Sequence, residues 1–251
     1  MEIWQYIVLF IISVIAGWID SIAGGGGILT LPALMACGLP PHLALGTNKV
    51  QGSCGSLSAL MVHIKKKTFT LKEARAGFIY SAVFGALGGV IAQVVSAKVL
   101  NYIIPALLAG IAVFMLINPK GALENKTRKI SAGLFFALAG ISIGFYDGFF
   151  GPGTGTFWAF SMIFFLGTEI RKATGLTKAM NFASNIGSLA LFIIGGNVII
   201  SLGLLMGLGQ YIGAQFGARH SLRNGGKIIK PALITVSLLL SAKLIYSAIM
   251  G

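Results

Sequence analysis

Residues 17–27, GWIDSIAGGGG, and residues 144–154, GFYDGFFGPGT, repeat one pattern in which an aspartate is followed by a run of glycines. The matched positions are Asp20 with Asp147 and Gly24 with Gly151. The pattern interrupts an apolar segment twice, at places about half a chain apart. The two breaks therefore predict a fold built from two related halves.

Two further matches support this internal repeat. ALGTNKVQGSCGSLSAL (44–60) resembles ATGLTKAMNFASNIGSLAL (173–191), and IIPALL (103–108) resembles the slightly longer IIKPALI (228–234). The three offsets are 127, 129 and 126 residues, and the matches follow one another in the same order. One shared motif could arise by chance, whereas three in order indicate a duplicated unit.

The composition is that of an integral membrane protein. Apolar residues make up 56% of the 251 residues, charged residues only 10%, and the mean hydropathy is +0.88. A soluble domain of this size carries roughly 25% charged residues. Glu2 is the only charge before the first apolar run, so we expect this run to be a retained helix rather than a signal peptide.

Apolar runs long enough to cross about 30 Å of hydrocarbon recur along the chain. Eight long spans are expected at residues 3–19, 44–63, 76–95, 99–117, 130–147, 173–194, 198–217 and 229–249. Two shorter stretches, 26–37 and 155–167, each follow a glycine-rich break. The predicted fold class is therefore all-α integral membrane, with eight long and two short segments.

The distribution of basic residues decides whether the short stretches count as crossings. If both cross, 15 basic residues fall in loops on one side of the membrane, and Lys98 is the only loop cation on the other. If neither crosses, nine cations oppose seven, which is almost no bias. We therefore expect about ten transmembrane segments in the cell (inner) membrane, with both termini outside. The cytoplasmic basic loops would be 64–75, 118–129, 168–172 and 219–230.

Five segments per copy is an odd number, so the second copy would lie inverted in the membrane with respect to the first. Inverted repeats with broken helices are common in secondary transporters. The expected division is a first repeat at 1–120, a cytoplasmic linker at 121–129 and a second, inverted repeat at 130–251.

The stretches 24–27 and 151–155 are unfavourable in a continuous helix. Glycine costs roughly 1 kcal/mol relative to alanine in a helix, and Pro152 removes a backbone donor. Unwound backbone and the N-terminus of the following helix can bind an anion. The candidate substrate-binding residues here are Gly25, Gly26, Gly153 and Thr154. The alternative is a tight hairpin in which glycine only lets two backbones approach.

Polar residues also lie inside the matched spans, and Lys49 of the first copy matches Lys178 of the second. A lysine at the centre of a membrane helix costs about 2.5–3.5 kcal/mol and usually faces a cavity or a partner. Snorkelling to the interface is the alternative for the lysines, and hydrogen bonding between helices is the alternative for the asparagines. The candidate substrate-binding residues of these spans are Asn48, Lys49, Gln51, Thr177, Lys178, Asn181 and Asn185.

Asp20 and Asp147 precede the two breaks at equivalent positions, and three roles are open for them. They could cap the short helices, pair with Lys178 or Lys49, or carry a coupling proton. Capping or pairing is favoured over a proton relay.

The sequence argues against several classes of function. The net charge of +13 comes mainly from short loops between apolar runs, which does not indicate nucleic-acid binding. The three histidines and two cysteines lack the spacing of a metal site, and no hydrolase, kinase or P-loop motif occurs. We expect no enzymatic activity, cofactor, metal or nucleic-acid partner. The expected partners are a small anionic substrate and the lipid bilayer, and a homodimer is left open.

GWIDSIAGGGGILTLPAL (17–34), ALGTNK (44–49) and GFYDGFFGPGTG (144–155) together resemble the TauE/SafE sulfite exporter superfamily, and the resemblance covers nearly the whole chain. It implies secondary transport, typically outward, of sulfite, of sulfonates such as sulfoacetate, or of other small organic anions. The second copy departs from the first, because GTNK becomes GLTK and Asn48 is matched by Thr177. The two half-sites are therefore not expected to be fully equivalent.

The sequence thus predicts an exporter of a small anion, such as sulfite or an organosulfonate, that works by alternating access. Lys49 and Lys178 would supply positive charge, the asparagines and Thr177 hydrogen bonds, and the glycine breaks backbone donors. Three alternatives remain open. They are a permease for a neutral or cationic metabolite whose lysines pair with the aspartates, a channel, and a non-transporting membrane assembly factor.

Overall fold

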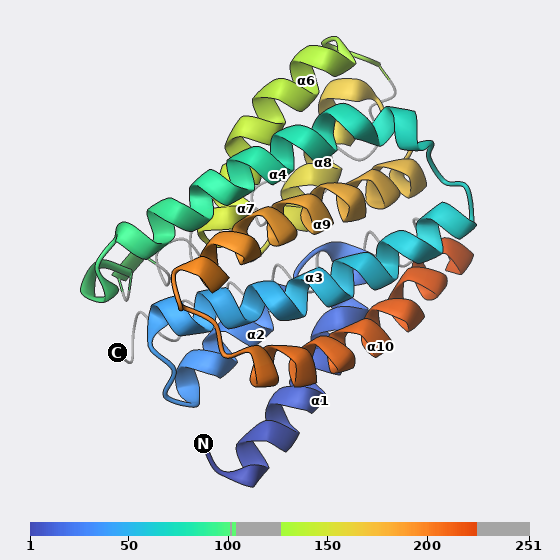
Figure 1. Ribbon diagram of the computed structural model, residues 1–251. Coiled ribbons are helices and arrows are strands. Elements are labelled where there is room, and N and C mark those ends of the chain that lie inside the picture. The colour runs from blue at the N-terminus through green and yellow to red at the C-terminus, as the bar shows by residue number, and fades with distance from the viewer. Residues whose placement is uncertain (101, 104–126, 225–251) are drawn as a thin grey trace, which may run out of the picture.

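The computed structural model describes residues 1–100, 102–103 and 127–224, and this part of the chain is built from helices without a strand (Figure 1). The first half contains α1 (Ile3–Ala23), α2 (Gly26–Ala36), α3 (Pro41–Lys65) and α4 (Leu71–Val94). The second half contains α6 (Ala132–Ala139), η2 (Gly140–Gly144), α7 (Phe145–Phe149), α8 (Thr154–Leu166), α9 (Ile170–Ile194) and α10 (Ile200–Asn224).

The order of elements is the same in the two halves. In each, a long helical segment leads to a glycine-rich break, a short helix and then two long helices. In the second half the first segment is interrupted by a π-helical turn, η2, between α6 and α7. The all-α fold class is confirmed for the described residues. The spans expected at 99–117 and 229–249 and the linker at 121–129 lie largely outside them.

Within the described residues, three helical segments are long and apolar enough to cross a membrane: Ile3–Ile22, Leu71–Val94 and Ala132–Phe149. Helices α3 and α9 instead carry the polar residues of the matched spans. At 1.5 Å per residue, α2 and α8 are only about 16 and 20 Å long, short of the roughly 30 Å of a bilayer core. Ten crossings in two inverted repeats therefore stay a prediction.

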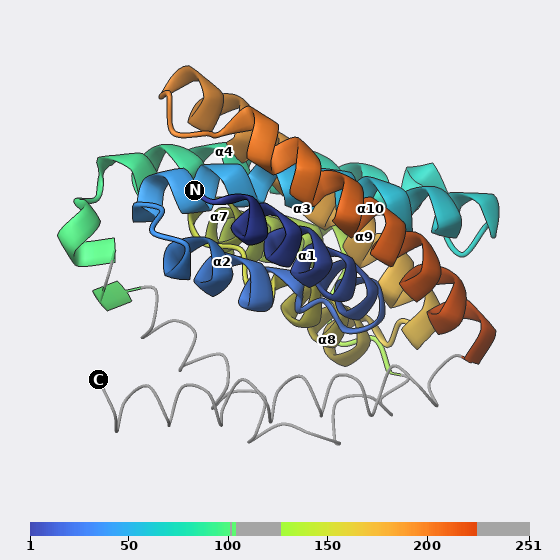
Figure 2. The same cartoon turned by 90° about the horizontal axis from the view of Figure 1, so that it is seen from below.

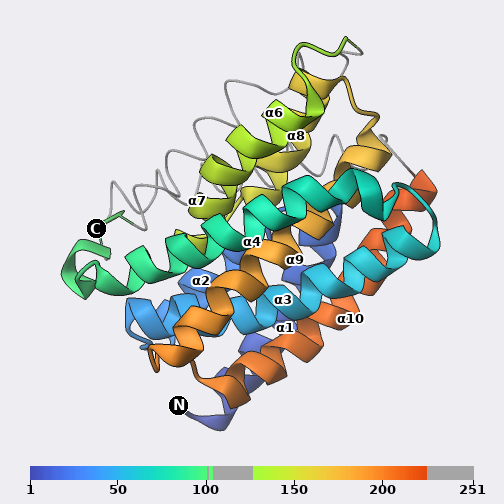
Figure 3. The same cartoon turned by 45° about the horizontal axis from the view of Figure 1, so that its top comes forward.

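Helices α3 and α9 lie next to each other at the centre of the bundle. Helix α10 packs against α1 and α3, and α4 packs against α9 and against the α6–η2–α7 segment. Figure 3 shows α3 and α9 between α4 on one side and α10 on the other, and Figure 2 shows α1 beside α10. Matched helices thus occupy matched places around the central pair.

Two apolar clusters lie toward opposite ends of α3 and α9. One includes Leu45 near the start of α3 and Phe192 near the end of α9, together with residues of α2. The other includes Leu60 near the end of α3 and Leu176 near the start of α9, together with residues of α8. The buried polar residues of both central helices lie mainly between these clusters along the chain, so apolar packing separates them from the two ends of the bundle.

Both glycine-rich breaks occur where the sequence predicts them. Gly24 follows α1 with a φ of 77°, and Gly151 and Gly153 between α7 and α8 have φ values of 100° and 80°, a left-handed backbone that favours glycine. The breaks also touch each other, because a Cβ on Gly24 would lie 2.5 Å from the carbonyl carbon of Gly155. Unwinding and close backbone approach are both present, so the two interpretations of the glycines are not exclusive.

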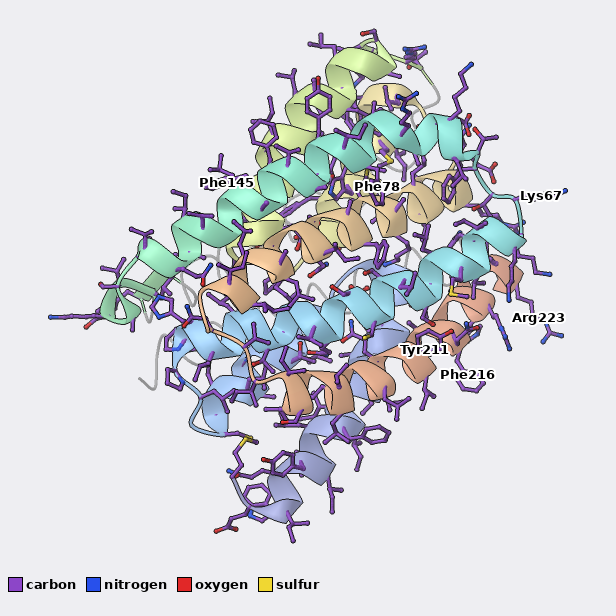
Figure 4. All side chains as sticks on the ribbon, in the orientation of Figure 1. Lys67, Phe78, Phe145, Tyr211, Phe216 and Arg223 are labelled. Carbon is purple, nitrogen blue, oxygen red and sulfur yellow. The ribbon has the colours of Figure 1, made fainter. Side chains whose placement is uncertain are left out.

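Apolar side chains cover much of the outer surface. On α10, Leu204, Leu208, Ile212 and Phe216 recur every four residues and are exposed, and Figure 4 shows Phe216 on the outside of the helix. Ile7, Ile11 and Ile15 form a second exposed stripe on α1. An apolar surface of this extent is unfavourable in water and suits contact with lipid.

The described basic loops gather at one end of the bundle. The end of α3, the start of α9 and the end of α10 line one hollow, to which Lys65, Arg171 and Arg223 contribute. The backbone amide of Lys129 donates to the carbonyl oxygen of Phe165 at 2.8 Å, so the segment before α6 lies near the end of α8. Figure 4 shows Arg223 at this end. The loop pattern expected from the sequence requires the basic loops to share one end of the bundle, as the described loops do here. That this end faces the cytoplasm is still a prediction.

The contact between the breaks makes a prediction about stability. Gly24→Ala should lower thermal stability more than Gly38→Ala, measured by unfolding in detergent. Both glycines have a left-handed φ, 77° and 89°, so both variants incur about 1–2 kcal/mol of backbone strain. A Cβ on Gly38 would meet no described atom within 4 Å, whereas one on Gly24 collides with the second break, which adds about 1–3 kcal/mol. Equal losses for the two variants would show that the contact between the breaks is not tight.

Candidate functional site

Lys49 of α3 reaches from the first half of the chain to Asp147 of α7 in the second. Its Nζ lies 3.2 Å from Oδ1 of Asp147 and also donates to the carbonyl oxygen of the same residue. The two side chains are 1% and 3% exposed. Lys49 therefore does not snorkel in this structure, because its ammonium group is buried and paired.

Lys178 of α9 makes the reciprocal contact. Its Nζ lies 3.4 Å from Oδ2 of Asp20 at the end of α1, and it also donates to the Asp20 carbonyl oxygen. The side chains are 1% and 15% exposed. Each lysine thus binds the aspartate of the opposite half, and the two pairs cross at positions that the sequence repeat had matched.

Each carboxylate has a second donor. Oδ1 of Asp20 accepts from the backbone N–H of Gly26 at 3.2 Å, so Asp20 both pairs with a lysine and binds the N-terminus of α2. Oδ2 of Asp147 accepts from the hydroxyl of Ser184 instead. Helix α8 begins after Gly153 without a side-chain cap. Both aspartates are thus paired with a lysine, and among the described contacts Asp20 also binds a helix N-terminus whereas Asp147 does not.

A small cavity of about 40 Å³ lies where the breaks and the central helices meet, a volume on the order of a few water molecules. Of the predicted site residues, it brings together Asp20, Asp147, Asn48, Lys49, Asn181, Asn185 and Gly153. Glycines of both breaks, among them Gly24, Gly27 and Gly151, complete this part of the wall. The cavity lies between the two apolar clusters.

Six predicted site residues do not line this cavity. Gln51 donates from Nε2 to Gln210, and the Thr177 hydroxyl donates to the Ala173 carbonyl oxygen at 2.8 Å. The Thr154 hydroxyl donates to the Gly151 carbonyl oxygen at 2.5 Å. The other three are Gly25, Gly26 and Lys178. Gly26 and Lys178 each donate to the Asp20 carboxylate, and Gly25 is the N-cap residue of α2.

Asn181 differs from the other polar groups of the cavity. Asn48 accepts from the Thr30 hydroxyl at 2.7 Å, and Asn185 donates from Nδ2 to the Asn181 carbonyl oxygen at 2.6 Å. The Asn181 side chain is buried in a residue only 6% exposed, and its Oδ1 has no hydrogen-bond partner within the described part of the chain. A buried amide oxygen without a donor is costly to keep, so Asn181 is a candidate to bind a solute; its Oδ1 would accept from a solute donor, and its Nδ2 would donate to an oxyanion.

The structure adds residues that the motifs did not single out. Gly52, Ser56 and Gln210 also line the cavity, and Ser184 holds Asp147. The 129-residue offset that relates Lys49 to Lys178 takes Gly52 to Asn181 and Ser56 to Asn185. Applying the repeat residue by residue would therefore have found two of them, whereas Gln210 and Ser184 carry no such signal.

No group of three or more His, Cys, Asp or Glu side chains is placed to hold a metal ion within the described residues. The three histidines lie apart. His42 contacts the carbonyl oxygen of Val95, His63 contacts Thr68, and His220 packs against the Trp18 ring.

Comparison with known proteins gives a consistent family. The family model described as "Sulfite exporter TauE/SafE" matches residues 9–244. The "Probable membrane transporter protein YfcA" of Escherichia coli (strain K12) is 44% identical over 241 residues, 96% of this chain and 90% of that protein. "Probable membrane transporter protein ORF9" of Sinorhizobium sp is 43% identical over 94% of this chain and 91% of its own length. No solved structure matches the chain.

The buried pairs make a second prediction. Lys49→Met or Asp147→Asn alone should destabilise the protein by about 3–5 kcal/mol, because each leaves a buried group without its partner. The double variant should recover a large part of that loss, measured as the coupling free energy of a double-mutant cycle.

The pair between Lys172 and Glu73 is the matched control for this cycle. Its nitrogen and oxygen lie 2.5 Å apart, but the side chains are 38% and 41% exposed. Glu73→Gln should therefore cost less than about 1 kcal/mol. A coupling free energy for Lys49 and Asp147 no larger than that of the exposed pair would contradict the role given to the buried one.

Proposed function

The chain belongs to the sulfite exporter TauE/SafE family, and on that premise we propose that it exports a small anion, such as sulfite or an organosulfonate, by alternating access. The family and its curated relatives, with the apolar helices, identify a multi-pass membrane protein of the transporter class. The substrate and the transport cycle are our proposal. Lys49 and Asn181, which line the cavity, are its main residues, and Lys178 holds Asp20 in the cavity wall.

The observation that carries the proposal is the pair of crossed lysine–aspartate contacts around a small polar cavity. Each charge at membrane depth costs about 2.5–3.5 kcal/mol to insert, and a buried pair is seldom more stabilising than apolar residues of the same volume. Four such charges are therefore poorly explained by stability alone. A site that must bind a charged solute in a dry interior does explain them.

The lysines retain capacity for a substrate oxygen. An ammonium group has three donors, and each lysine uses two, one on the aspartate side chain and one on its carbonyl oxygen. An anion near Lys49 and Asn181 would accept hydrogen bonds from the unused N–H groups without displacing the carboxylates. Gly26 and Ser184 would hold the carboxylates in place if a lysine turned toward the solute.

Alternating access is supported by the same geometry. Each lysine binds the broken segment of the opposite half, so a rocking motion of one half against the other would change both pairs together. The cavity is small and bounded by apolar clusters toward either end of the central helices, as expected for an occluded conformation. Inverted repeats with sites at the junction of broken helices work in this way.

A permease for a neutral metabolite is the second candidate. It is favoured by the charge balance at the centre, where two lysines and two aspartates give a formal sum of zero. In this case the pairs would be structural, and the solute would bind to the amides.

Flux into proteoliposomes distinguishes these functions. We expect saturable transport of sulfite, thiosulfate or sulfoacetate and weaker transport of taurine and small carboxylates. Asn181→Ala should raise KM by roughly 10–150-fold, because it removes the Nδ2 donor that we propose binds the charged group, while stability stays near that of the wild type. Thr177→Val is the control and should keep the wild-type KM, since the Thr177 hydroxyl is bonded within α9.

Other outcomes identify the alternatives. Saturable transport of uncharged solutes alone would favour the neutral permease, and flux that does not saturate would indicate a channel. No flux of any solute would favour a non-transporting assembly factor. An unchanged KM in a stable Asn181→Ala protein would remove Asn181 from the site.

The orientation is tested by thiol labelling in a background without Cys37 and Cys54. A cysteine at Lys66, at the basic end, should be protected from an impermeant reagent outside the cell, whereas one at Asn197, in the turn between α9 and α10, should react. If α2 and α8 do not cross the membrane, an even number of spans separates residues 66 and 197, and both positions would then give the same labelling. Labelling at 66 with protection at 197 would reverse the proposed orientation.

A further inference from the structure

A second hollow lies at the basic end of the bundle, separate from the central cavity. Its volume is about 700 Å³, and it lies between the end of α3, the start of α9 and the end of α10. Five cations line it: Lys65, Lys66, Arg171, Arg219 and Arg223. No carboxylate is among its lining residues in the described part of the chain.

In the described part of the chain, no acidic partner neutralises the five cations. None forms an ion pair within the described residues, whereas Lys172, next to Arg171, pairs with Glu73. Like charges around one concave surface repel each other, and the low-dielectric walls of a cleft focus their field. An oxyanion is the ligand class that relieves this repulsion.

Simpler explanations account for part of the pattern. Cations are favoured at the C-terminal ends of helices, which suits Lys65 and Arg223. The same dipole disfavours Arg171, which lies in the first turn of α9. The excess of basic residues in cytoplasmic loops explains why many cations lie at this end of the bundle. It does not explain why five of them line one hollow, because Lys67 lies in the same turn as Lys66 and does not line it.

The hollow also contains an unsatisfied polar group. Gln215 of α10 lines it, and Oε1 of Gln215 is buried without a hydrogen-bond partner among the described residues. Oε1 is an acceptor and does not itself bind an oxyanion, so this group shows only that the wall is polar. Gln210, which lines the central cavity, lies five residues earlier on the same helix. At 1.5 Å per residue, the two polar sites are about 8 Å apart along α10.

The side chains packed between α3 and α10 near the two sites are mostly small. A cluster between α3 and α10 consists of Ala59, Val62, Ala214 and Ala218, three of which carry only a methyl group. On the α9 side, Thr68 of the hollow contacts the ring of buried His63 at 3.1 Å. A Cβ on Gly175 would lie within 3 Å of both, and Gly175 is one turn before Lys178.

From these observations we infer that the basic hollow is a loading site, where the oxyanion group of the solute binds before it passes to the central cavity. The inference rests on the proposed function and adds the side from which the anion is taken. The ligand is a sulfonate, sulfite or related oxyanion free in solution. The phosphate of an anionic lipid shares this chemistry, and the experiment separates the two sources.

The test uses the full chain with Arg171→Gln, Arg219→Gln and Arg223→Gln combined, in oriented phosphatidylcholine proteoliposomes. With sulfoacetate at the basic end, KM should rise about 10-fold while kcat is unchanged. With sulfoacetate at the opposite end, KM should stay the same. The wild-type KM at the basic end should also rise with ionic strength, and that dependence should be largely lost in the variant. Lys67→Gln is the control and should behave as the wild type.

Other results overturn the inference in distinguishable ways. Saturable wild-type flux with the same KM in the triple variant contradicts the loading site and leaves the proposed function intact. Added phosphatidylglycerol is the test for a lipid. If it raises the thermal stability of the wild type but not of the triple variant, and KM is the same in both, the hollow binds a lipid headgroup.

A wild-type protein without flux contradicts the proposed function itself. Titration of purified protein with sulfoacetate then tests the hollow directly. Weaker binding in the triple variant supports an oxyanion site, and equal binding contradicts it.

Discussion

The two buried lysine–aspartate pairs are the contacts on which the arrangement of the halves depends. Lys49 and Lys178 each hold an aspartate that belongs to the other half of the chain. A charge left unpaired in such surroundings costs several kcal/mol, and in this arrangement each half neutralises the buried charges of the other. The halves must therefore meet in one register, and α3 and α9, which carry the lysines, take the centre of the bundle.

The glycine breaks make these pairs possible. By ending α1 and α7 inside the bundle, they bring the negative ends of two helix dipoles to the lysines, whose Nζ atoms also bind the carbonyl oxygens of Asp20 and Asp147. The same breaks begin α2 and α8, whose N-termini favour an anion near the cavity. One local feature, unwound backbone between two helix ends, thus provides sites for both signs of charge.

The main residues of this site could be predicted because the motif that carries them occurs twice in the sequence. The breaks, the matched aspartates and the matched lysines could all be read from spacing. The crossing of the pairs could not, because Lys49 and Asp147 are 98 residues apart and periodicity says nothing about which helices meet. Nor could the different roles of Thr177 and Asn181, since only the packing around each distinguishes a hydroxyl that bonds within its own helix from an amide whose oxygen has no partner among the described residues.

The two pairs are equivalent in position but not in chemistry. Asp147 is 3% exposed and held by a serine hydroxyl, whereas Asp20 is 15% exposed and held by a backbone N–H. A hydroxyl can rotate away from its acceptor, but a helix N-terminus is fixed by the helix that it begins. The differences in the second copy of the motif point the same way, because Thr177 stands where the first copy has Asn48. A transport cycle built on these pairs must therefore stress them unequally, and the pair at Asp147, with the movable donor, is the one that can rearrange without unwinding a helix.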